Sequence, residues 1–197
     1  MGKIEITKKV LGICATNCYT VVDTETKEAL IIDPADRADV LIRDWKDKGV
    51  TPTAVLLTHG HFDHIGALAG VKKEYPDIKV YAAAEEKEVM ESPALNLSSS
   101  FGAAFTAQAD IYLEDGAEIE VLGRKCKCLL VPGHTKGGMC YYFPEEHVVF
   151  TGDTLFCYSV GRTDFPTMRR LWKMPFVRNY LCFQMRHSCF RDMMHRQ

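Results

Sequence analysis

Four side chains of types that bind metal ions lie within six residues of one another in the segment LLTHGHFDHIGA, residues 56–67. They are His59, His61, Asp63 and His64. His59 and His61 are two positions apart, so on an extended strand end both point to the same side, where they could hold one ion. Asp63 and His64 follow after a turn and would aim at a neighbouring point. The spacing favours a metal site over a histidine-rich solvated loop.

Two further segments end in a metal-binding type of side chain. LLVPGHTKGG carries His134 after an apolar run, and HVVFTGDT carries Asp153 after Gly152. Apolar runs of this kind are typical of buried strands, and ligand sites in open sheet folds form beyond the carboxyl ends of the strands. A single His or Asp is more often structural. The combined set predicts that these side chains converge on one metal centre.

The hydrophobic pattern predicts the elements that position these residues. Short strands are expected at residues 3–10, 17–24, 28–35, 53–58 and 78–83, and helices at residues 36–49, 63–76 and 83–93. The strand–helix–strand order around residues 53–83 predicts a parallel crossover. Short strands and turns return over residues 118–153. The pattern favours an α/β fold in which two sheets pack face to face with helices outside.

The small-residue segment 94–110, ALNLSSSFGAAFTAQAD, is predicted to be a loop. Loops at this end of the sheets are placed to contact a ligand. We expect it to line or cover the substrate cleft, with Phe101 and Phe105 supplying apolar contacts. The alternative is ordinary surface packing of an irregular loop.

Composition indicates which partners to expect. The 197 residues are 47% hydrophobic and 25% charged, with a net charge of -2, as in a globular protein with one sizeable core. No basic footprint points to nucleic acid or an anionic membrane, and no apolar run approaches the roughly 20 residues of a membrane span. The N-terminal residues lack an apolar signal core, so a cytoplasmic location is expected. The expected partner is a small-molecule substrate, and the oligomeric state is open.

The cysteines are expected to be reduced thiols, mostly small buried apolar residues. There are eight of them, and they form no zinc-finger spacing. Cys126 and Cys128 alternate along an expected strand and should face the same side of it. We therefore expect no metal role for the cysteines.

The motifs resemble those of a known family. THGHFDHIGA is an H-x-H-x-D-H motif, and PGHT, TGDT and GRTDFP (residues 161–166) follow it in order. In this combination the sequence resembles the metallo-β-lactamase superfamily, and within it the small glyoxalase II-like (hydroxyacylglutathione hydrolase-like) hydrolases. The resemblance covers about residues 1–167. It implies an αββα sandwich of two mixed sheets flanked by helices, with residues 1–167 as the metallo-hydrolase core.

The resemblance also assigns ligands to two zinc ions. His59, His61 and His134 match the ligands of the first zinc, while Asp63 and His64 match ligands of the second. Asp153 matches the carboxylate that bridges both. Two cations about 3.5–4 Å apart would hold a hydroxide at neutral pH. Asp63 would also act as the catalytic residue that orients this hydroxide and passes its proton to the leaving group.

Supporting roles are expected for polar residues around this ligand set. Thr58 and Thr135 flank ligands and would donate hydrogen bonds to them. Asp33, at the end of an apolar strand, is expected to be a buried supporting carboxylate. Arg162 and Asp164 match a family segment beneath the site, where an ion pair is expected.

The function that the resemblance implies is hydrolysis of a thioester or related acyl compound. Glyoxalase II itself resembles this core with an added C-terminal helical domain that holds glutathione. We expect no such domain here, so the substrate is open. Persulfide dioxygenases share the motifs but use one iron, held by residues matching His59, His134 and Asp153. A promiscuous β-lactamase and an inactive binding module are further alternatives.

The C-terminal residues 168–197 depart from the family pattern. The family leads us to expect an amphipathic helix, a strand and a further PGH histidine, whereas this tail is rich in Met, Arg, Cys, Phe and His. Read from the third codon base, FRDMMH (residues 190–195) permits Pro-Gly-His-Asp-Ala. We therefore predict a frameshift near Met168, a weakened second metal site and association through exposed apolar surface. The alternative is a genuine divergent tail in which His195, or else His187, supplies the missing ligand.

Overall fold

The computed structural model describes residues 2–156 and 159–162. Its larger sheet has six strands in the order β1-β2-β3-β4-β5-β6. These strands are β1 (Ile4–Leu11), β2 (Thr16–Asp23), β3 (Glu28–Ile32), β4 (Thr51–Leu56), β5 (Lys79–Ala83) and β6 (Ile111–Leu113). The pairs among β1, β2 and β3 are antiparallel, and those from β3 to β6 are parallel. The sheet is therefore mixed, and it contains the predicted parallel crossover.

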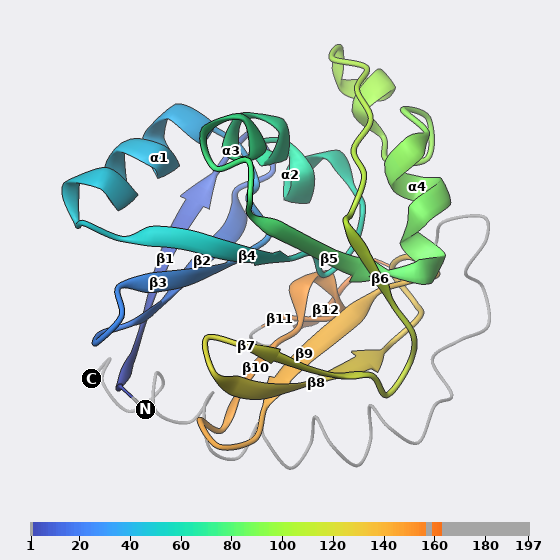
Figure 1. Ribbon diagram of the computed structural model, residues 1–197. Helices are drawn as coiled ribbons and strands as arrows, with labels where there is room; N and C mark the ends of the chain where they lie inside the picture. The colour runs from blue at the N-terminus through green and yellow to red at the C-terminus, as the bar shows by residue number, and fades with distance from the viewer. Residues whose placement is uncertain (1, 157–158, 163–197) are drawn as a thin grey trace, which may run out of the picture.

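The second sheet packs beneath the first (Figure 1). Its order is β10-β9-β8-β7, and its described pairs are all antiparallel. The strands are β7 (Glu118–Val121), β8 (Arg124–Leu130), β9 (Met139–Phe143) and β10 (Val148–Phe150), followed by the short pair β11 (Leu155–Phe156) and β12 (Ser159–Val160). The expected sandwich of two sheets is confirmed, but among the described pairs only the first sheet is mixed.

Helices lie on the outer face of the first sheet (Figure 1). The α-helices are α1 (Ala38–Asp47), α2 (Phe62–Ile65), α3 (Leu68–Glu74) and α4 (Lys87–Glu91), and the short 3-10 helices are η1 (Ala84–Glu86), η2 (Ser98–Phe101) and η3 (Gly152–Thr154). Along residues 2–156 and 159–162, no helix covers the outer face of the second sheet. The helix layer described is thus the one above the larger sheet.

Strand β3 is buried on both faces and so contributes to two cores. Leu30 and Ile32 point between the sheets, where they join Tyr141 of β9. Ile31, on the opposite face, packs under the helices with Trp45 of α1. Since neighbouring strand residues point to opposite faces, this alternation explains the continuous apolar run of β3.

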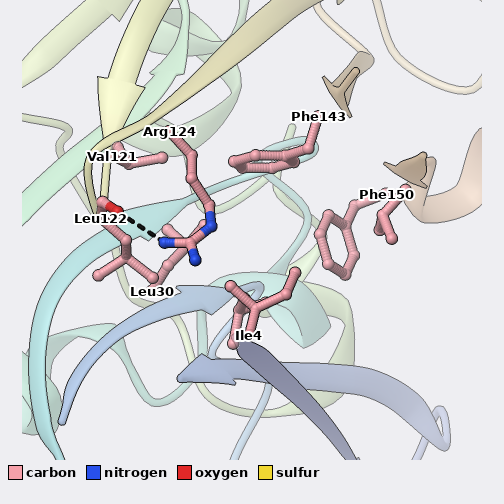
Figure 2. A pocket seen from close by; sticks show the side chains of 9 residues that line it. Ile4, Leu30, Val121, Leu122, Arg124, Phe143 and Phe150 are labelled. Carbon is pink, nitrogen blue, oxygen red and sulfur yellow. Dashed lines mark hydrogen bonds between the residues drawn. The ribbon is translucent and has the colours of Figure 1, made fainter. Parts of the chain in front are cut away.

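A buried arginine closes the end of the sandwich at which β3 and β4 begin. Arg124 lines a small, mainly apolar cavity between the sheets, beside Phe143 and Phe150 (Figure 2). Its guanidinium donates to Asp23 Oδ2 at 2.9 Å and lies 2.7 Å from Glu146 Oε1. A buried charge is tolerated only when paired in this way.

The structure corrects two predicted helices. The helix predicted at residues 63–76 is divided into α2 and α3, because Gly66 packs against the carbonyl of Ala35 and Ala67 N–H donates to Pro34 O at 2.9 Å. The helix predicted at residues 83–93 is η1 followed by a shortened α4. Periodicity alone does not reveal such tertiary contacts.

Several predictions fall on residues that the structure does not describe. The tail 168–197, with His187 and His195, lies outside the described residues, as does Asp164. Within the described ranges, no helix has both the length and the apolar character of a membrane span.

Candidate metal centre

The H-x-H-x-D-H motif lies directly beyond the carboxyl end of β4. His61 is the last extended residue before α2 (φ -67°, ψ 149°), and Asp63 and His64 belong to that helix. The change from extended to helical backbone separates the motif into two pairs of side chains, as the spacing predicts. His59, His61 and His64 are all buried.

Three imidazoles from the two sheets meet at one point. His59 Nε2 lies 3.2 Å from His61 Nδ1, which lies 2.9 Å from His134 Nε2. His134 arrives on the turn between β8 and β9. The three nitrogens lie within 4.8 Å of one another, an arrangement suited to ligands of one cation.

Hydrogen bonds on the opposite ring nitrogens orient two of these imidazoles. Thr58 Oγ1 lies 3.2 Å from His59 Nδ1, and His134 Nδ1 lies 3.0 Å from the carbonyl oxygen of Arg162. A partner on one ring nitrogen fixes the ring and directs the other nitrogen toward a metal. Thr58 was expected to donate to a ligand, but its hydroxyl donates to Asp33 Oδ2 and so faces His59 Nδ1 as an acceptor. Arg162 contributes its carbonyl. Thr135 is buried in the same turn as His134, and its carbonyl accepts the N–H of Gly133 at 3.0 Å.

A second group of ligand atoms adjoins the first. His64 Nε2 lies 3.3 Å from Asp153 Oδ1 and 3.6 Å from Asp63 Oδ2. This buried nitrogen has no hydrogen-bond partner among the described residues. Asp33 Oδ2 lies 2.9 Å from the other ring nitrogen, Nδ1. A buried nitrogen that faces two carboxylates without a hydrogen bond fits a bound cation.

Asp33 and Gly152 bring this second group into place. Asp33 accepts the N–H and the hydroxyl of Thr58, both at 2.7 Å, so it links the strand end to His64. Gly152 has φ +49°, and a Cβ there would lie 2.6 Å from the Cβ of Thr58. Only glycine allows the backbone to pass so close, and Asp153 follows it into the site.

The first imidazole group is electrostatically suited to a cation. Burial lowers the pKa of His59 well below its ordinary value, and the neighbouring histidines lower it further. Burial and the His134 ring lower the pKa of His61 to about 3. These rings are therefore neutral near pH 7, which is the form that binds metals.

The second group favours positive charge. Burial opposes protonation of His64, but the carboxylates of Asp33, Asp153 and Asp63 outweigh it and raise its pKa to about 10. Burial raises the pKa of Asp153, yet the nearby His64 and other imidazoles lower it overall. Carboxylates that stabilise a proton here would also stabilise a metal ion.

Sequence reasoning missed two residues that position the site. Thr16 Oγ1 donates to Asp63 Oδ2 at 2.5 Å. Glu86 is fully buried, and its carboxylate accepts N–H groups from Gly60 and Gly137. Both lie far along the chain from the motifs, and a single Thr or Glu carries no signal of its own. The acidic run containing Glu86 gave no reason to expect burial.

The two phenylalanines of segment 94–110 have different environments. Phe101 is 51% exposed and stacks on Phe62, with ring centroids 4.4 Å apart. Phe62 stands between His61 and Asp63 in the chain, so this aromatic pair borders the metal centre. Phe105 instead packs, partly buried, against the core under the helices. The segment thus reaches the site through Phe101.

The described cysteines contribute nothing to the two ligand groups. Neither group contains a thiol. Cys126 and Cys128 are buried together between the sheets, on the same side of β8 as predicted. Cys14 is exposed, and burial and then Asp63 raise the pKa of its thiol.

The amino-acid sequence is similar to those of known metallo-hydrolases. A family model described as the metallo-beta-lactamase superfamily matches residues 11–185. The probable metallo-hydrolase YqgX of Bacillus subtilis is 37% identical over 156 residues, covering 78% of this chain and 72% of YqgX. The hydroxyacylglutathione hydrolase GloC of Haemophilus influenzae is 33% identical over 156 residues, covering 76% and 71%.

Solved structures are also similar to this chain. BLEG-1, a B3 metallo-beta-lactamase, superposes with a TM-score of 0.82 at 36% identity, covering 90% of this chain and 85% of its own. TTHA1623, solved in a di-iron-bound form, gives a TM-score of 0.69 at 34% identity, covering 81% and 78%. Similar proteins therefore include both a β-lactamase and an iron-bound protein.

Proposed function

This chain belongs to the metallo-β-lactamase superfamily, and we propose that it is a glyoxalase II-like hydrolase that cleaves a thioester or related acyl compound with zinc. Its similarity to GloC supports the substrate class. The reducing cytoplasm is the proposed compartment, in keeping with the free thiols of the five cysteines that the structure describes.

The residues present fit the metal. His59, His61 and His134 would hold the first ion, and Asp63, His64 and Asp153 the second. When bound, zinc supplies a hydroxide at neutral pH and a Lewis acid for the substrate carbonyl. No thiolate is among these ligands to reduce that acidity.

Asp63 is the residue that we propose to move the proton. Its Oδ2 accepts the Thr16 hydroxyl at 2.5 Å, which helps to orient the carboxylate for the reacting water. The carboxylate takes the proton of the water and delivers it to the departing sulfur. The products are a carboxylic acid and a thiol.

A single observation carries the proposal. Three imidazoles converge within 4.8 Å at the junction of two sheets, beside His64 and two carboxylates. Three ring nitrogens so close together form a donor set suited to one shared cation.

A second candidate is an iron-dependent persulfide dioxygenase. His134 Nε2 lies 3.5 Å from Asp153 Oδ2, and ligand atoms of His59, His64 and Asp153 lie within 4.8 Å of one another. Two histidines and one carboxylate suit Fe(II) and oxygen. The similarity to TTHA1623 in its di-iron-bound form adds support for iron.

Metal analysis combined with three activity assays tests the proposal. Protein produced with both zinc and iron available would be assayed for hydrolysis of S-lactoylglutathione and acetyl thioesters, for oxygen uptake with glutathione persulfide, and for β-lactam hydrolysis. We expect bound zinc and thioester hydrolysis. One iron per chain with oxygen uptake would replace this function with the dioxygenase, and β-lactam hydrolysis alone would replace it with a lactamase.

A further inference from the structure

We propose that Glu86 is a positioning residue that uses one buried carboxylate to hold the two histidine-bearing loops of the metal centre together. The proposal rests on the metal centre of the proposed function, but not on the identity of the substrate. It concerns Gly60, which separates His59 from His61, and Gly137, which follows His134 in the turn between β8 and β9.

The carboxylate contacts one backbone group on each loop. Oε2 accepts the N–H of Gly60 at 2.6 Å, and Oε1 accepts the N–H of Gly137 at 2.8 Å. Glu86 is fully buried at the end of η1, the turn that follows β5. A buried carboxylate that accepts two backbone N–H groups makes strong, directional hydrogen bonds.

The loops are shaped to receive this side chain. A Cβ on Gly137 would lie 2.7 Å from Glu86 Cγ and 2.8 Å from its backbone nitrogen. A Cβ on Gly60 would lie 3.0 Å from Glu86 Oε2. The same Cβ on Gly60 would lie 2.7 Å from Met90 Cγ. Glu86 therefore explains the glycine at position 137, and Glu86 together with Met90 explains the glycine at position 60.

Besides the 2.9 Å contact between His61 Nδ1 and His134 Nε2, described hydrogen bonds join the two sheets close to the strand ends. Met139 N–H donates to Thr58 O at 2.8 Å, and the Tyr141 hydroxyl donates to Leu57 O at 2.7 Å. The turn that carries His134 is closed on itself, since Val131 N–H donates to Gly138 O at 2.6 Å. This turn is therefore a compact unit, and Glu86 bonds its backbone to the backbone of the loop that carries His59 and His61.

The chemistry of the side chain makes this role testable. Burial raises the pKa of Glu86, while the Thr135 side chain and the N–H groups of Gly60 and Gly137 oppose that rise by stabilising the carboxylate. Glutamine has nearly the same shape, but its NH₂ would face one of the two N–H groups, and two donors cannot bond each other. Glu86→Gln should therefore release one loop while leaving the packing in place.

The experiment compares Glu86→Gln with Glu85→Gln, a matched change at the exposed neighbouring glutamate. Metal-free protein would be titrated with Co²⁺ in competition with a chromophoric chelator, and the d–d absorption bands of the bound ion recorded. Urea unfolding of the metal-free proteins would measure fold stability separately. Gly137→Ala, which crowds the same contact from the loop side, serves as a second variant.

We expect Glu86→Gln and Gly137→Ala to weaken Co²⁺ affinity by about 10- to 100-fold and to change the d–d bands, with Glu85→Gln matching the unaltered protein. Unchanged affinity and bands in both variants would overturn the proposal, even if urea unfolding shows a loss of stability. Unaltered protein that binds no Co²⁺ would overturn the metal centre and the role of Glu86 together. Co²⁺ binding without thioester hydrolysis would contradict only the proposed substrate.

Discussion

At the scale of single residues, the site combines two adjacent electrostatic environments. His59 and His61 are held neutral, and burial is the principal cause. His64 lies in the helix that follows His61. Its surroundings favour positive charge because three carboxylates surround it. Neutral imidazoles provide ligand lone pairs, and the carboxylates offset the charge of the ions.

Thr16 should control catalysis through Asp63. Thr16→Val removes the hydroxyl that fixes Asp63 Oδ2 at nearly constant volume, whereas Thr16→Ser keeps it. We expect Thr16→Val to lower kcat for a thioester by about 10- to 100-fold with little change in KM, and Thr16→Ser to recover most of the rate. Steady-state kinetics of the two variants measure this directly. Equal rates in both would remove Thr16 from the mechanism.

At the scale of elements, the sequence correctly predicted the features that depend on local hydrophobic patterns. The apolar runs of β3 and β4, the crossover to β5 and the convergence of strand ends followed from alternation and connection rules. The division between α2 and α3 did not, because it depends on contacts of Gly66 and Ala67 with residues 34–35. Glu86 was missed for the same reason, since its partners lie on distant loops.

Segment 94–110 offers an element-scale test, because its two phenylalanines have different surroundings. Phe101→Ala removes an exposed ring stacked on Phe62 and should raise KM by roughly tenfold, about 1.4 kcal/mol of binding, with little loss of stability. Phe105→Ala removes a ring packed against the core and should lower the free energy of unfolding by about 2 kcal/mol. Thioester kinetics and urea unfolding separate the two effects. Unchanged KM for Phe101→Ala would place the substrate elsewhere.

At the scale of the whole molecule, the two ends of the sandwich have different tasks. The end near Arg124 is closed by buried ion pairs with Asp23 and Glu146. The opposite end, beyond the carboxyl ends of the strands, collects the ligands on loops, as open α/β sheets commonly do. Charge is thus used for stability at one end and for metal binding at the other.

The second ion is proposed to bind more weakly than the first. The described residues supply it with Asp63, His64 and Asp153, whereas the predicted further histidine falls in the tail 168–197, outside the described residues. A frameshift near Met168 stays a prediction of the sequence. It implies that restoring the frame would strengthen the second site.

Zinc reconstitution followed by thioester hydrolysis tests the central claim most directly. Metal-free protein and its His134→Ala variant would be titrated with zinc while S-lactoylglutathione hydrolysis is measured. We predict a tight first equivalent, a weaker second, activity that rises with bound zinc, and a loss of first-site affinity of more than about 100-fold in His134→Ala. Equal hydrolysis by metal-free and zinc-loaded protein, or equal zinc affinity in the variant, would contradict the account.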